Sequence, residues 1–169
     1  MNCLPTKAVA VAVLSLLLSQ TSQAAPATPP VTVTGGAIAG SQDGPLNTYF
    51  GVPFAAPPVG DLRWRPPQPV VAWAGERPAR DFSPACAQTA TWIPNPKSED
   101  CLYLNLWAPA KAKGLPVIVW IHGGAMDSGA AAVPVQNGAN LAKRGAVVVT
   151  INYRLGIFGF YASPELSAE

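Results

Sequence analysis

The sequence predicts an α/β fold in which antiparallel N-terminal strands lead into a mostly parallel central sheet. Residues 116–121 and 146–151 are continuous apolar runs rich in β-branched side chains, which is typical of parallel strands covered on both faces. Earlier in the chain, residues 31–34, 37–40 and 48–52 are short β-type runs broken by Gly and Pro. Such runs indicate an antiparallel hairpin or meander.

The first 24 residues have the pattern of a secretory signal peptide. Lys7 supplies the positive charge, residues 8–18 are apolar, and Ser22 and Ala24 are small residues at the positions that a signal peptidase inspects. A membrane anchor is the alternative, but the apolar run is shorter than the about 20 residues needed to cross a bilayer. We therefore expect cleavage after Ala24, no stable membrane anchor, and a secreted or periplasmic protein.

Composition limits the partners of the chain. Residues 25–32 are rich in Pro and Ala and are expected to be a disordered linker. Charged residues make up 12% of the chain and apolar residues 49%, whereas an ordinary soluble domain has roughly 25% charged residues. This composition is more typical of a largely buried part of a larger protein than of an independent soluble domain. Its formal charge of +2, or +1 without Lys7, argues against nucleic acid or an anionic membrane as the main partner.

The middle of the chain predicts a loop, a strand and a crossover unit. Residues 53–69 contain six prolines, so we expect an ordered loop and no strand in a sheet. Residues 102–107 alternate with the leucines on one face, as in a half-exposed strand. Residues 135–144 end in a cationic turn before Gly145, which predicts a helix connecting the two apolar runs.

The cysteines predict one disulfide. Cys3 leaves with the signal peptide, so Cys86 and Cys101 remain, and in an oxidising compartment they would most simply bond to each other. Two buried free thiols are the alternative. With one histidine and two cysteines, a metal site is not expected. The glycine patterns that cradle phosphates are also missing, and we expect no cofactor.

The apolar run at 117–121 leads directly into His122, Gly123, Gly124 and Ala125. Glycines after a buried strand let the backbone turn so that consecutive N–H groups point at one spot, which is how an oxyanion hole is built. The alternative is that the glycines only make a tight turn. The chain has no Gly-x-Ser-x-Gly motif and no second histidine, so it cannot complete a serine hydrolase on its own.

Four sequence blocks resemble the N-terminal third of the type B carboxylesterases, the family of α/β-hydrolase fold that includes cholinesterases and bile-salt lipases. The likeness covers residues 33–169, which would be the N-terminal part of an incomplete carboxylesterase domain. The blocks occur in the expected order: residues 49–55 with 57–60, residues 62–67, residues 98–105, and residues 122–125 with 152–156.

The resemblance implies roles for individual residues. Gly124 and Ala125 match the two backbone donors of the oxyanion hole, Gly123 supports them, and His122 is expected to be a structural, hydrogen-bonded residue rather than a general base. The nucleophilic serine of the family lies downstream of this chain. Met126 differs from the family at this point, as does Asp127, because an aromatic pair usually follows the oxyanion turn.

The same resemblance implies roles for three further residues. Arg63 and Glu99 match a buried ion pair that fastens the disulfide loop to the proline-rich loop, with solvated surface charges as the alternative. Trp92 lies near the position of a cation-binding tryptophan in cholinesterases, although a lone tryptophan is more often a packing residue.

Two functions from different classes follow. The first is the front part of an exported serine ester hydrolase that binds a small-molecule ester only in the complete protein, the chain alone being inactive. The second is a non-catalytic cholinesterase-like binding or adhesion module, or an inactive truncated product. In either case the open sheet edges predict self-association.

Overall fold

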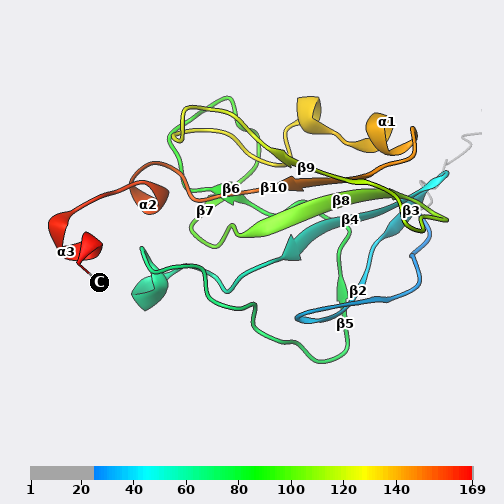
Figure 1. Cartoon of the computed structure of the whole chain (residues 1–169), viewed down its shortest axis with the longest axis horizontal. Coiled ribbons are helices and arrows are strands. Elements are labelled where there is room, and N and C mark those ends of the chain that lie inside the picture. The colour runs from blue at the N-terminus through cyan, green and yellow to red at the C-terminus, as the bar shows by residue number, and fades with distance from the viewer. Residues whose placement is uncertain (1–24, 169) are drawn as a thin grey trace, which may run out of the picture.

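The computed structural model describes residues 25–168, and a five-stranded sheet organises them (Figure 1). The signal peptide predicted at residues 1–24 lies outside the described residues. In spatial order the strands are β3 (Ser41–Asp43), β4 (Leu46–Pro53), β8 (Tyr103–Pro109), β10 (Val147–Ile151) and β9 (Val117–Ile121). Within this part of the chain, no helix is both long and apolar enough to span a membrane.

The central sheet is mixed. The two apolar runs form a parallel pair, β9 with β10, in the register Val147↔Val117 to Ile151↔Ile121. Strand β10 then pairs antiparallel with β8, and the N-terminal strands β4 and β3 continue antiparallel from there. The antiparallel N-terminal strands therefore lead into a parallel pair at one edge, as the order of the sequence patterns predicts.

A second, three-stranded sheet consists of β1 (Val31–Val33), β2 (Gly36–Ala39) and β5 (Glu76–Pro78), with the predicted hairpin between β1 and β2. Trp73 fixes this hairpin, since a Cβ added at Gly35 would lie 2.1 Å from its ring. Its Nε1 donates to the Ala37 carbonyl oxygen at 2.8 Å.

The segment expected to be a disordered linker, residues 25–32, is ordered in the structure. Ala27 forms an antiparallel bridge with Ser41, and the backbone N–H of Thr28 donates to the Gly40 carbonyl. The Thr28 side chain is buried and accepts a hydrogen bond from the Gly40 N–H at 2.9 Å. Backbone pairing with a neighbouring strand thus orders a segment whose composition predicts disorder.

The helix predicted over residues 135–144 is much shorter in the structure. Residues Pro134–Gln136 form a 3₁₀ turn, and α1 covers only Ala139–Ala142. Asn137 is extended, with φ of −62° and ψ of 115°, and interrupts the helix, whereas the next residue, Gly138, has helical dihedrals and packs closely on Val148. Asn137 then starts α1 by accepting the Ala139 N–H with its side chain.

Strand β8 is covered on both faces, contrary to its alternating sequence. Asn105 and Trp107 are each only 2% exposed on one face, while Leu104 and Leu106 on the other face are partly buried. Asn105 can be buried because its side chain accepts the Gly51 N–H and donates to Thr150 Oγ1. The face of β8 that carries Asn105 and Trp107 is therefore more deeply buried than the face that carries the leucines.

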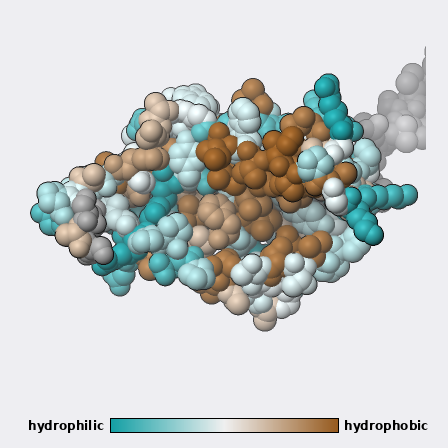
Figure 2. All heavy atoms as spheres, in the orientation of Figure 1, coloured by the Kyte–Doolittle hydropathy of each residue, from teal (hydrophilic) through white to brown (hydrophobic). Residues whose placement is uncertain are grey.

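The remaining elements are short. They are η1 (Gly60–Leu62) in the proline-rich loop, which is ordered as predicted, the two-stranded pair β6 (Ala85–Cys86) and β7 (Lys97–Ser98), α2 (Gly156–Gly159) and α3 (Pro164–Ser167). Figure 2 shows an apolar patch in the region where Figure 1 places β9, and every residue of this strand is exposed. Among the described residues, β9 pairs on one side only.

Candidate active site

The site begins at His122, where β9 ends. This side chain is 3% exposed, and its ring stacks on Tyr153 with 4.3 Å between ring centroids. Its Nδ1 lies 2.9 Å from the Gly123 carbonyl oxygen, so Nδ1–H donates there. The Tyr153 hydroxyl donates in turn to the His122 carbonyl oxygen at 2.7 Å. Tyr153 lies two residues after the end of β10 and thus holds the end of the neighbouring strand, β9.

Burial lowers the pKa of His122, and the hydrogen bond to Gly123 opposes this effect only in part. The imidazole is therefore neutral at neutral pH. Its contacts among the described residues are with backbone and with an aromatic ring.

The turn that follows has unusual backbone geometry. Gly124 has a φ of 127°, and Ala125 and Met126 have left-handed φ values of 53° and 64°. Non-glycine residues rarely adopt this conformation, because it costs roughly 1–2 kcal/mol per residue. The Gly124 carbonyl oxygen closes the turn by accepting the N–H groups of Asp127 and Ser128 at 3.1 and 3.0 Å.

The backbone N–H groups from Gly123 to Met126 donate no hydrogen bond within the described residues, and the predicted pair of oxyanion donors is among them. Within residues 25–168, neither the Gly124 N–H nor the Ala125 N–H donates a hydrogen bond. Both follow the carboxyl end of a parallel strand, and neither is used by the sheet. Free consecutive N–H groups in a left-handed turn attract negatively charged oxygen.

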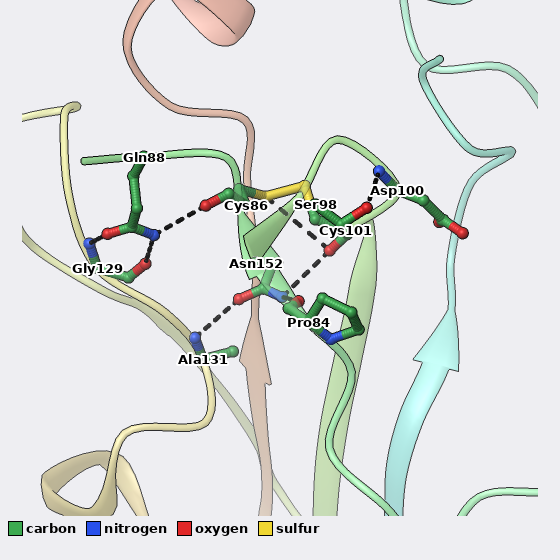
Figure 3. The surroundings of a disulfide bond; sticks show 9 residues. All are labelled: Pro84, Cys86, Gln88, Ser98, Asp100, Cys101, Gly129, Ala131 and Asn152. Atoms are coloured by element: carbon green, nitrogen blue, oxygen red, sulfur yellow. Dashed lines mark hydrogen bonds between the residues drawn. A yellow bond between two sulfur atoms is a disulfide. The ribbon is translucent and has the colours of Figure 1, made fainter. Parts of the chain in front are cut away.

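Two other segments hold this turn from outside (Figure 3). Gln88 in the disulfide loop binds both backbone groups of Gly129, at the end of the turn. Asn152, after β10, donates to the carbonyl oxygens of Pro84 and Cys101 and accepts the Ala131 N–H at 2.8 Å. Neither role was predicted from the sequence, because each depends on partners more than 20 residues away.

The predicted disulfide is present. Cys86 and Cys101 are bonded, both are buried, and they close a loop of sequence separation 15. The loop carries Trp92, whose side chain is 62% exposed. This tryptophan is therefore not a core packing residue within the described part of the chain.

Arg63 and Glu99 form a two-point ion pair, with Nε to Oε2 at 2.5 Å and Nη2 to Oε1 at 2.8 Å. The hydrogen bond and the charge of Glu99 raise the pKa of Arg63. The pair joins the proline-rich loop to the disulfide loop as expected. The prediction that this pair is buried is wrong, since the side chains of Arg63 and Glu99 are 38% and 25% exposed.

A cavity of about 370 Å³ lies beside the turn. Its lining includes Gln88, Thr89, Asp127, Leu155 and Ile157. Asp127 is exposed at its wall. In the described residues, no three His, Cys, Asp or Glu side chains are grouped so that they could hold a metal ion.

The model of the carboxylesterase family matches residues 27–168. The chain belongs to this family. A fumonisin B1 esterase of Sphingopyxis macrogoltabida is 51% identical over 140 residues, which is 79% of this chain and 26% of the relative. The para-nitrobenzyl esterase of Bacillus subtilis is 42% identical over 77% of this chain and 28% of its own length. The chain thus spans about a quarter of these relatives.

Solved structures of the family show the same fold. A PNB esterase superposes with a TM-score of 0.76 at 40% identity, covering 80% of this chain and 29% of the other. A carboxylesterase of Geobacillus stearothermophilus gives a TM-score of 0.72 at 42% identity, over 78% of this chain and 27% of the other. The described residues therefore form part of an α/β-hydrolase fold.

Proposed function

We propose that this chain is the N-terminal part of an exported, serine-dependent carboxylic ester hydrolase, and that it contributes the oxyanion hole. The observation that carries the proposal is the pair of free N–H groups at Gly124 and Ala125, at the carboxyl end of a parallel strand. Membership of the carboxylesterase family supports the reaction class. A small-molecule ester is the expected substrate of the complete protein.

In this mechanism a serine outside residues 1–169 attacks the ester carbonyl carbon, and its proton passes to a histidine oriented by a carboxylate. The carbonyl oxygen becomes negatively charged and accepts hydrogen bonds from the Gly124 and Ala125 N–H groups. The alcohol leaves with the proton, and water then releases the acid by the same route. Losing one such donor typically costs about 3–4 kcal/mol of transition-state stabilisation.

The chain itself supplies positioning and no nucleophile. Its single histidine is the buried His122. We therefore expect the purified 169-residue protein to hydrolyse p-nitrophenyl acetate no faster than the same protein unfolded in urea. A burst of p-nitrophenol that an organophosphate abolishes would contradict this expectation.

The decisive test is the sequence downstream of Glu169 in the source gene. A Gly-x-Ser-x-Gly motif soon after this residue, followed by an acidic residue and a histidine, would support the hydrolase. Its absence would favour the non-catalytic module or an inactive truncated product. Export is tested separately: N-terminal sequencing of protein recovered outside the cytoplasm should begin at Ala25, and an uncut Met1 would contradict the predicted signal peptide.

A further inference from the structure

The side chain of Gln88 makes three hydrogen bonds to backbone groups (Figure 3). Its Nε2 donates to the Gly129 carbonyl oxygen at 2.7 Å and to the Cys86 carbonyl oxygen at 2.9 Å. Its Oε1 accepts the Gly129 N–H at 2.9 Å. Both donors of the carboxamide and its acceptor are thus in use, so the side chain has one fixed orientation.

Gly129 is held by a second group as well. A Cβ added at this glycine would lie 2.2 Å from His122 Nδ1, and the φ of 126° is one that side-chain-bearing residues rarely adopt. The backbone of Gly129 therefore packs directly on the buried imidazole while both its polar groups bind Gln88. This fixes the end of the turn that begins at Gly123.

The turn needs such restraint because its backbone is strained. Three consecutive residues, Gly124, Ala125 and Met126, have positive φ values, and strained backbone persists only where the surroundings hold it. The Gly156 N–H holds the middle by donating to the Met126 carbonyl oxygen at 2.8 Å. Gln88 holds the end, from a loop 41 residues earlier in the chain.

We infer that Gln88 is a positioning residue, which fixes the direction of the free Gly124 and Ala125 N–H groups by closing the turn at Gly129. The inference rests on the proposed function for its catalytic meaning. Since Gln88 also binds the Cys86 carbonyl oxygen, it connects the disulfide directly to the turn. Without Gln88, Gly129 loses both partners and the strained residues can relax.

The test measures amide hydrogen exchange of the full 169-residue chain by mass spectrometry at single-residue resolution. The reporters are the Asp127 and Ser128 amides, which donate to the Gly124 carbonyl oxygen and not to Gln88. We expect the Gln88→Ala variant to exchange these amides about tenfold faster or more, because the turn opens locally, while the β10 amides stay protected. Gln68→Ala is the matched control, since this exposed glutamine bonds only locally, to Pro66.

The Gln88→Glu variant tests the same point with a side chain of nearly the same size. An ionised carboxylate cannot donate to the two carbonyl oxygens that Gln88 binds, so the reporters should also exchange faster at pH 7. Unchanged exchange of Asp127 and Ser128 in either folded variant overturns the inference. If both variants lose protection in β10, Gln88 is a general folding residue and the inference is equally overturned.

Catalysis is measured separately. If the gene continues into a nucleophile, Gln88→Ala in the complete enzyme should lower kcat for p-nitrophenyl acetate about tenfold while KM changes little, because the oxyanion donors act in the transition state. The exchange measurement involves no ester. It can therefore support the structural role of Gln88 even if the proposed esterase activity is not found. An unchanged kcat in a variant with an opened turn would remove the catalytic role and leave the structural one.

Discussion

At the scale of single residues, His122 links the pH of the solution to the stability of the turn. Burial lowers its pKa in the folded protein below the unfolded value of about 6.5. The unfolded chain therefore binds the proton more readily, and this contribution to stability is complete above pH 6.5 and is lost as the pH falls towards the folded pKa. No second histidine exists in the chain.

We therefore expect the melting temperature to fall between pH 7.5 and pH 5.5, and the His122→Phe variant to show a smaller fall. Phenylalanine keeps a ring against Tyr153 but does not titrate. Thermal unfolding followed by circular dichroism at both pH values measures the difference. Equal falls in the parent and the variant would show that another group is responsible.

The two central glycines of the turn should differ sharply in their tolerance of a side chain. A Cβ at Gly124 would lie 1.8 Å from the Ser128 carbonyl oxygen, whereas nothing lies within 4 Å of a Cβ at Gly123. We expect Gly124→Ala to cost about 2 kcal/mol or more, from overpacking and left-handed strain. Gly123→Ala should change stability by less than about 0.5 kcal/mol. Urea unfolding of both variants tests this, and equal losses would contradict the geometry of the turn.

At the scale of elements, the disulfide loop holds the turn and the proline-rich loop together. Cys86 and Cys101 close it, Gln88 reaches the turn, and Glu99 reaches Arg63. Short elements such as β6 and β7, of two residues each, cannot be stable alone. We therefore expect the disulfide to contribute more to the stability of this loop than it would to that of a long hairpin, which has many backbone hydrogen bonds of its own.

We expect replacement of both cysteines by alanine to lower the free energy of unfolding by about 3 kcal/mol, the chain-entropy value for a loop of this length. Urea midpoints with and without dithiothreitol provide the measurement. The parent should lose stability on reduction, while the double variant should not respond. A parent that is insensitive to complete reduction would show that the loop is held by its non-covalent contacts.

At the scale of the whole molecule, all five residues of the exposed strand β9 belong to the exposed apolar surface, and Figure 2 shows an apolar patch in this region. Its side chains are exposed on both faces, and one of its edges has no partner strand among residues 25–168. An apolar, unpaired edge of this kind promotes strand-to-strand association. We propose that copies of this chain associate through β9.

Sedimentation velocity should therefore show oligomers that increase with concentration. The Val119→Lys variant, in the middle of β9, should shift the distribution towards monomer, because an edge lysine opposes pairing. Val71→Lys is the control, since Val71 is similarly exposed but lies outside the strands. A monomeric parent, or an equal effect of both substitutions, would contradict the proposed interface.

Part of the fold and of the site could be predicted from local sequence. The apolar, β-branched runs at 117–121 and 147–151 predict parallel strands, and they pair as predicted. The expected cover on both faces is wrong for β9, because all five of its residues are exposed within the described part of the chain. The His-Gly-Gly-Ala sequence marks the turn, because glycine accepts positive φ. The left-handed φ values at Ala125 and Met126 could not be predicted, since those residues adopt such values only under external restraint.

Other features depend on contacts between distant segments. The helix expected over 135–144 shrinks to Ala139–Ala142, because the chain is extended at Asn137, next to Gly138, which packs on Val148 of β10. Asn105, a polar residue in an alternating strand, is buried because Gly51 and Thr150 satisfy its amide. Nothing in the local sequence distinguishes such residues from exposed ones.

The sequence by itself determined the longer apolar strands, the order of the motifs, the cysteine pair and the position of the turn, because these follow from side-chain polarity, backbone preference and spacing along the chain. The short strands β3, β5, β6 and β7 were not predicted. Only the tertiary structure decided that His122 is buried on Tyr153, and that the N–H groups of Gly124 and Ala125 stay free. It also decided that Gln88 holds the end of the turn. The physical reason is that hydrogen bonds and burial join groups by proximity in space, which folding creates between residues far apart in the chain.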